Sequence, residues 1–165
     1  MPKNSRLRSV CDDPVDIEQA RPGTYVLVLS SRSTDLIQIG RLGDLQLRSG
    51  FYVYVGSALG PGGVGARLAH HLKPSRRPHW HIDYLRAHSR VEEICYRLDT
   101  RHLEHVWAEH IGLAEGAYIP LVGFESTDCG CQSHLFFFER RSSHERFRHV
   151  LGKAIRTVSC SRRRT

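Results

Sequence analysis

Apolar residues fall in short runs along the chain, and these runs predict β-strands. Residues 25–29 form a nearly continuous apolar run, and 51–55 form another directly after Gly50. Such runs are typical of strands that are buried on both faces. Between them, 35–39 and 45–47 are shorter candidate strands joined by turn-forming residues. We therefore predict an antiparallel sheet with a hairpin inserted between its first two long strands.

The rest of the chain predicts further strands and several helices. Strands are expected over 91–98 and 135–138, and helices over 64–73, 78–85, 100–111 and 143–156. Thr100 is a candidate helix cap with Gly112 as the stop, and Ser142 with Glu145 fits a capping box. The expected fold class is α/β (α+β): a small, mainly antiparallel central β-sheet of three core strands plus the hairpin insertion, flanked by helices.

The length predicts how many domains the chain forms, and the cysteine content predicts its cellular compartment. A chain of 165 residues favours one domain, which we place at 23–157 between a flexible arm (1–22) and a basic tail (158–165). The basic start is followed by no apolar stretch, and no run reaches the ~20 apolar residues that span a bilayer. With five cysteines, an odd number, we expect a cytoplasmic protein with reduced thiols and no membrane contact.

The net charge favours a polyanionic partner. The formal charge is +7, and eleven histidines add to it at mildly acidic pH. Each phosphate that a cation neutralises releases condensed counterions, so a basic excess promotes binding to nucleic acid. A basic protein with no such partner has the same charge, but we favour nucleic acid.

Two short strings in the predicted strands carry the candidate chemistry: Gly23-Thr24-Tyr25 and Tyr54-Val55-Gly56. Arg67 and Glu104 follow on predicted helices. Phosphodiester hydrolysis needs an activated water, a counter-charge and help for the leaving oxygen. A carboxylate can hold Mg²⁺ or Mn²⁺, which polarises the phosphate, and an arginine can fork onto two phosphate oxygens. Each residue alone is most often an ordinary half-buried aromatic or a solvated charge, so the argument rests on the combination.

A histidine completes this set. His71 lies one helical turn after Arg67 and therefore on the same helix face. A free tyrosine has a pKa near ~10, so Tyr25 or Tyr54 needs help to act as a base near neutrality. His71 can share the proton transfer or bind phosphate.

These residues resemble the GIY-YIG nuclease superfamily. Gly23-Thr24-Tyr25 stands where that family has its first motif and Tyr54-Val55-Gly56 where it has its second, and Arg67, His71 and Glu104 match its helical residues. The longer strings at 50–58, 79–85 and 128–135 are similar to a Uri-type branch, whose members occur alone or joined to DNA-repair domains. The resemblance covers about residues 22–140.

The resemblance implies a role for each residue. Tyr25 would orient or deprotonate the water, and Tyr54 would support it with a hydrogen bond. Arg67 would bind the phosphate, Glu104 would hold one Mg²⁺ or Mn²⁺ ion, and His71 would join the catalytic group. Two features depart from the family's pattern: Thr24 occupies a position that need only suit a strand, and the hairpin insertion lengthens the gap between the motifs, which bears on substrate shape.

A second cluster lies in Cys129-Gly130-Cys131-Gln132-Ser133-His134. Two thiols and an imidazole suggest zinc, but a structural site needs four ligands and its cysteines are usually spaced by two to four residues. Asp128, His79 or His81 can complete a site only if the fold brings it close. We favour a tight turn with packed thiols over a metal site; a third interpretation is a loop that borders the cleft.

The leading hypothesis is a metal-dependent DNA endonuclease of repair or recombination type. One alternative is a catalytically silent nucleic-acid-binding module, although such a module would be free to lose Tyr25, Tyr54, Arg67 and Glu104. Another is a zinc-dependent interaction domain built on the Cys129 loop. A DNA-repair protein is a further candidate partner, and the substrate structure and the oligomeric state are left open.

Overall fold

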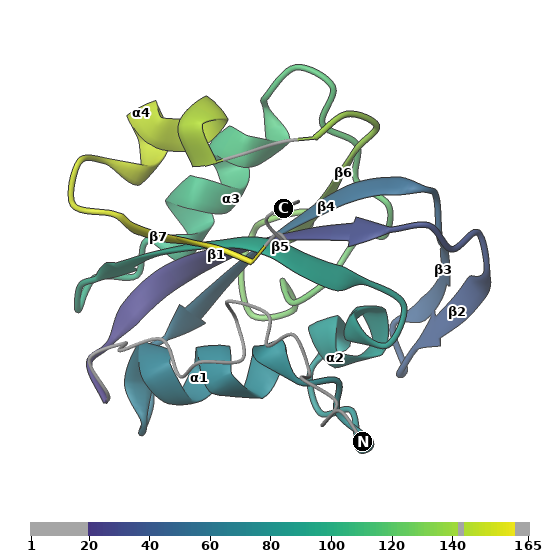
Figure 1. Cartoon of the computed structure of the whole chain (residues 1–165), viewed down its shortest axis with the longest axis horizontal. Helices are drawn as coiled ribbons and strands as arrows, with labels where there is room; N and C mark the ends of the chain where they lie inside the picture. The colour runs from purple at the N-terminus through teal and green to yellow at the C-terminus, as the bar shows by residue number, and fades with distance from the viewer. Residues whose placement is uncertain (1–19, 142–143, 161–165) are drawn as a thin grey trace, which may run out of the picture.

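The computed structural model describes residues 20–141 and 144–160, and its centre is a five-stranded antiparallel sheet (Figure 1). Across the sheet the strands run in the order β6 (Leu135–Phe138), β4 (Gly50–Ala58), β1 (Gly23–Ser31), β5 (Arg90–Leu98) and β7 (Arg156–Ser159). Every neighbouring pair is antiparallel. The predicted α+β class with a mainly antiparallel sheet is therefore confirmed.

Both faces of the sheet are covered, as the continuous apolar runs predict. Helices α1 (Gly63–Leu72) and α2 (His81–Arg86) lie on one face, and α3 (Glu104–Gly112) and α4 (Arg148–Leu151), which follows the 3-10 turn η1 (His144–Phe147), lie on the other (Figure 1). Alternate residues of β1 point to opposite faces: Tyr25 and Leu27 join the core under α1 and α2, whereas Val26 and Val28 join the core under α3.

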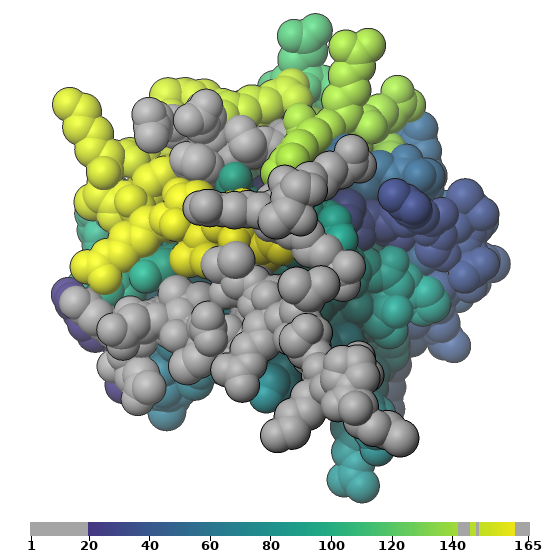
Figure 2. All heavy atoms as spheres, in the orientation of Figure 1, coloured from purple at the N-terminus to yellow at the C-terminus, as the bar shows by residue number. Residues whose placement is uncertain are grey.

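The predicted hairpin insertion is present. Strands β2 (Leu36–Ile39) and β3 (Gly43–Gln46) form a separate two-stranded sheet. Its side chains Ile37, Ile39 and Leu45 are buried in the same core as Tyr25, whereas Leu36 is exposed. Figure 2 shows this hairpin, in blue, at one end of the molecule, away from the start of β1.

The C-terminal segment differs from the sequence prediction. A helix was expected through residue 156, but α4 ends at Leu151 and Gly152 follows with φ of 82°, a left-handed conformation that ends helices. The chain then forms β7, whose Val158 pairs with Ile94 of β5. An edge strand gains backbone hydrogen bonds that local periodicity does not reveal. The predicted capping box at Ser142 and Glu145 lies outside the residues whose side chains are described.

Two smaller predictions are also wrong. Helix α3 begins at Glu104 with Leu103 as its cap, because Asp99 accepts hydrogen bonds from the backbone and side chain of Arg101 and fixes a turn ahead of the helix. Thr100 therefore caps nothing. Cys160 is disulfide-bonded, so the expectation of reduced thiols fails at this residue, while Cys95, Cys129 and Cys131 are free.

Within 20–141 and 144–160, no helix is both long and apolar enough to cross a membrane.

Candidate active site

The two motif tyrosines face each other on one side of the sheet. Tyr25 of β1 pairs with Gly56 of β4, and Leu27 pairs with Tyr54. Side chains two residues apart on a strand share a face, so this register makes Tyr25 and Tyr54 diagonal neighbours. Their ring centroids are 6.2 Å apart. The sequence prediction that the phenols converge from neighbouring strands therefore agrees with the structure.

The glycine of the second motif makes room for Tyr25. A Cβ atom on Gly56 would lie 2.4 Å from the Tyr25 hydroxyl oxygen and 2.5 Å from its Cζ atom, distances at which the ring could not remain in place. Any larger residue at position 56 would displace the phenol. The close approach of the Tyr25 ring therefore explains why position 56 is a glycine.

Helix α1 supplies the partner of Tyr25. The Tyr25 hydroxyl is 2.7 Å from Nε2 of His71, and both residues are almost fully buried, with 0% and 1% of their surface exposed. Burial raises the pKa of Tyr25 above its usual value, while Arg67 and a hydrogen bond from Tyr54 lower it by smaller amounts. Burial also lowers the pKa of His71 to about 3. Both groups are neutral at physiological pH.

Tyr25 lies between Tyr54 and His71. Its hydroxyl can donate to His71 Nε2, whose imidazole is uncharged and able to accept. In the free protein the raised pKa of Tyr25 and the lowered pKa of His71 keep the proton on the phenol. The contact therefore fixes the orientation of the Tyr25 hydroxyl.

The buried histidine makes folding stability depend on pH. The folded-state pKa of His71 lies near 3, below the unfolded value of about 6.5, so the unfolded chain binds this proton first as pH falls. The contribution is complete above pH ~6.5 and is progressively lost as pH falls toward the folded pKa. Asp83 favours protonation, whereas His70, Arg67 and Arg86 oppose it.

We expect His71→Gln to remove this pH dependence. Between pH 7.5 and pH 5 the wild-type protein should lose about 2 kcal/mol of unfolding free energy through this group, and the variant should not. Urea unfolding followed by tryptophan fluorescence at the two pH values measures the difference. His110→Gln, at an exposed position on α3, should keep the wild-type loss. An unchanged pH dependence in His71→Gln would show that His71 is not held neutral by burial.

Arg67 lies beside this cluster with its guanidinium available. Its Cζ atom is 4.1 Å from the centroid of the Trp80 ring, a cation–π distance that holds the planar group in one orientation. Within the described part of the chain, no carboxylate forms an ion pair with it. The side chain is half-buried and its charge lowers the pKa of Tyr25. It is therefore positioned for an anion that none of the described carboxylates supplies.

Asp83 fixes the start of α2, where Trp80 is the N-cap residue. Its carboxylate accepts backbone N–H bonds from His79 and Trp80 and lies 2.8 Å from Nε2 of His70 on α1. Burial alone would raise the pKa of Asp83, but these hydrogen bonds outweigh it and the pKa is lowered. The carboxylate thus joins α1 to the start of α2. His79, a candidate cleft residue, is exposed.

Glu104 is the first residue of α3, and its side chain is 19% exposed. Its negative charge raises the pKa of Tyr25, after the larger effect of burial and that of Glu125. It also acts on His134, and Oε1 lies 3.9 Å from Nε2 of His105. Helix α3 covers the face of the sheet opposite to Tyr25 and α1 (Figure 1), so Glu104 acts on Tyr25 through its charge, and its one described ion-pair contact is with His105.

A second carboxylate, Glu125, belongs to the site and was not anticipated. It adopts φ of 51°, a conformation that is uncommon outside glycine. Its Oε1 accepts the His81 N–H at 2.5 Å, and its own N–H donates to His81 Nδ1. Burial raises its pKa, opposed by His81, and its charge acts on both Tyr25 and Tyr54. The sequence held no signal for it, because it lies in a loop without a motif.

The fold brings four metal-ligand side chains together around the Cys129 loop. Ligand atoms of His105, Cys129, Cys131 and His134 all lie within 4.8 Å of one another. The fourth member, His105, comes from α3 and was not among the sequence candidates: His81 bonds to Glu125, and Asp128 is exposed. A cavity of about 770 Å³ borders this loop, lined by residues that include Glu109, Leu113 and Gln132. The loop therefore forms one wall of a hollow.

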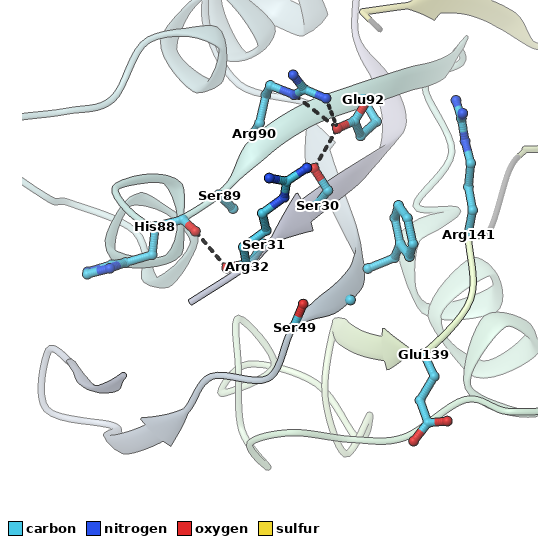
Figure 3. Close-up of a pocket in the computed structure, with 12 residues that line it drawn as sticks. Ser30, Ser31, Arg32, Ser49, His88, Ser89, Arg90, Glu92, Glu139 and Arg141 are labelled. Atoms are coloured by element: carbon cyan, nitrogen blue, oxygen red, sulfur yellow. Dashed lines mark hydrogen bonds and ion pairs between the residues drawn. The ribbon is translucent and has the colours of Figure 1, made fainter. Parts of the chain in front are cut away.

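A different cavity, of about 800 Å³, lies at the other end of β1 (Figure 3). Ser30 and Arg90 both bond to Glu92 there, and Ser31 donates to the carbonyl oxygen of His88. Arg32 and Arg141 also line it. None of the candidate catalytic residues does, so it is separate from the tyrosine site.

The comparison with protein families identifies the chain by family only. The model described as Domain of unknown function DUF123 matches residues 24–156, which is most of the sequence. The protein therefore belongs to the DUF123 family, whose function is not characterised. No curated protein and no solved structure matches the chain.

Proposed function

We propose that this protein is a GIY-YIG-type endonuclease that uses a divalent metal ion to hydrolyse phosphodiester bonds in DNA during repair or recombination. The observation that carries the proposal is the contact of Tyr25, Tyr54 and His71 beside an arginine that has no carboxylate partner in the described chain. A buried chain of proton donors next to an available cation is what a phosphate-cutting site requires.

The donors near the tyrosines fit a hard divalent ion. Glu104 and Glu125 supply carboxylate oxygens, the ligands that Mg²⁺ and Mn²⁺ prefer, and Glu104 forms no ion pair shorter than 3.9 Å among the described residues. Glu104 would hold the ion. When bound, the ion would supply charge that polarises the phosphate and stabilises the leaving oxygen.

The protein's own side chains account for the other steps. Arg67 forks onto two phosphate oxygens while Trp80 keeps its guanidinium oriented. Once the substrate admits water and so relieves the burial that lowers the pKa of His71, Tyr25 would accept a proton from the attacking water as it passes its own hydroxyl proton to His71 Nε2. Because Tyr25 and Tyr54 are closed to solvent in the free protein, the water must enter with the substrate.

The test is cleavage of a labelled panel of DNA and RNA structures: duplex, single strand, flap and branch. We expect cutting of at least one DNA structure when Mg²⁺ or Mn²⁺ is present and none without it, and no cutting by Glu104→Ala protein prepared in parallel. Equal cutting by the two proteins would reject the role assigned to Glu104. Binding without cutting across the whole panel would favour a silent nucleic-acid-binding module.

The proton chain makes its own prediction. Tyr25→Phe keeps the ring but loses the hydroxyl, and we expect single-turnover cleavage to slow about 10²-fold, the usual contribution of a positioned base. Tyr54→Phe should slow it less, since Tyr54 acts through Tyr25. Tyr118→Phe, at an exposed position, is the control. A Tyr25→Phe protein as fast as the wild type would remove Tyr25 from the reaction.

A further inference from the structure

Two cysteines and two histidines from separate segments converge beside the proposed active site. His105 belongs to the first turn of α3, Cys129 and Cys131 to the loop that follows Ser126, and His134 directly precedes β6. Their ligand atoms lie within 4.8 Å of one another. The loop has no regular secondary structure, although backbone hydrogen bonds from Cys129 to Ser126 and from His134 to Phe124 help to place two of the four groups.

The distances fit the edges of a metal tetrahedron. Cys129 Sγ lies 3.4 Å from His134 Nε2, and Cys131 Sγ lies 3.7 Å from His105 Nδ1. With Zn–S bonds of about 2.3 Å and Zn–N bonds of about 2.0–2.1 Å, tetrahedral geometry separates sulfur and nitrogen ligands by about 3.6 Å. Both contacts are close to that separation. A set of two sulfur and two nitrogen ligands in this geometry is typical of zinc.

The surroundings also suit a bound ion. Two thiolates balance the charge of Zn²⁺, so the complete cluster is neutral, as burial of His134 at 2% exposure requires. His105 turns Nδ1 toward the cluster, and its other nitrogen lies 3.9 Å from the Glu104 carboxylate. Histidines that bind a metal usually donate the N–H of their second nitrogen to a carboxylate, and here the carboxylate is at an ion-pair distance, beyond that of a hydrogen bond.

We propose that His105, Cys129, Cys131 and His134 form a structural zinc site that fastens the loop to the start of α3. Binding releases the two thiol protons to solvent as the Zn–S bonds form. All four positions are filled by protein, so the ion is structural and has no open position for substrate. Glu104 is adjacent to His105 in sequence, so the site also positions Glu104. The zinc site itself does not depend on the proposed nuclease function.

The experiment measures the metal content of the full chain, purified without a histidine tag in a non-thiol reductant. We expect about one zinc per chain after extensive dialysis, and at least a ~10-fold lower content in Cys131→Ser and in His105→Gln. Two variants serve as matched controls: Cys95→Ala removes a free thiol elsewhere, and His110→Gln removes an exposed histidine of the same helix. Both should retain the zinc.

Wild-type protein with less than ~0.1 zinc per chain, or the same content in Cys131→Ser as in the wild type, would overturn the proposal. Should the cluster variants fail to fold, cobalt-substituted wild-type protein decides. Strong visible bands of tetrahedral cobalt with thiolate-to-cobalt charge transfer support the site, and their absence overturns it. These readouts need no nucleic acid, so a protein that holds zinc and cuts nothing would reject the nuclease and retain the zinc site.

Discussion

Glu104→Gln should reduce metal-dependent cleavage about 10³-fold, a loss of about 4 kcal/mol of transition-state stabilisation. Glutamine keeps the size of the side chain and one oxygen but removes the charge that would hold the ion. The half-buried position at the start of α3 tolerates this exchange, so the fold should be retained. Single-turnover rates at saturating Mg²⁺, with circular dichroism as the check on folding, measure the effect.

The matched control is Glu109→Gln, an exposed carboxylate on the same helix, which should cut at the wild-type rate. A Glu104→Gln protein that retains wild-type cleavage would move the metal away from Glu104. In that case Glu125→Gln becomes the decisive variant, because the Glu125 charge acts on both tyrosines.

Arg67→Ala should slow cleavage by a comparable factor, about 10³-fold. The guanidinium is held by Trp80 and has no carboxylate partner among the described residues, so its removal deprives the transition state of charge and costs the free protein little. Arg67→Lys should recover only part of the rate, since an ammonium group keeps the charge but not the two-pronged geometry. Single-turnover rates of the three proteins on one DNA substrate give the comparison.

Arg76→Ala controls for the general loss of positive charge, because Arg76 is exposed in the loop after α1. It should change the salt dependence of binding slightly and leave the cleavage step unaltered. Equal rates for Arg67→Ala and Arg76→Ala would show that Arg67 contributes only to the overall charge.

The sequence predicted the sheet and the shared helix face of Arg67 and His71 because both depend on residues that are close together in the chain. Short, nearly continuous apolar runs located β1 and β4, and similar short segments located β5 and β6. One-turn spacing put Arg67 and His71 on the same face of α1, and the register of β1 with β4 follows from the pairing of two buried strands. The Gly56 requirement was not visible in advance, since it arises from the Tyr25 ring crossing the neighbouring strand.

Long-range proximity accounts for what the sequence could not predict. Glu125 lies near the tyrosines only because the loop after Phe124 packs on the start of α2, where Glu125 and His81 form two hydrogen bonds. His105 meets Cys131 across 26 positions of the chain, so the cysteine spacing alone favoured a packed turn over a metal site. Strand β7 forms because it pairs with the outer edge of β5. The helical periodicity of residues 143–156 does not indicate this pairing.

The most direct measurement is a crystal structure of the protein with Mn²⁺ and a DNA substrate made uncleavable at the scissile linkage. We predict manganese, located by its anomalous scattering, at Glu104, with Arg67 bonded to the same phosphate and the Tyr25 oxygen next to the attacking water. Phosphates bound elsewhere, such as between Arg32 and Arg141 in the cavity at the other end of β1, with no ion at Glu104, would contradict the assignment.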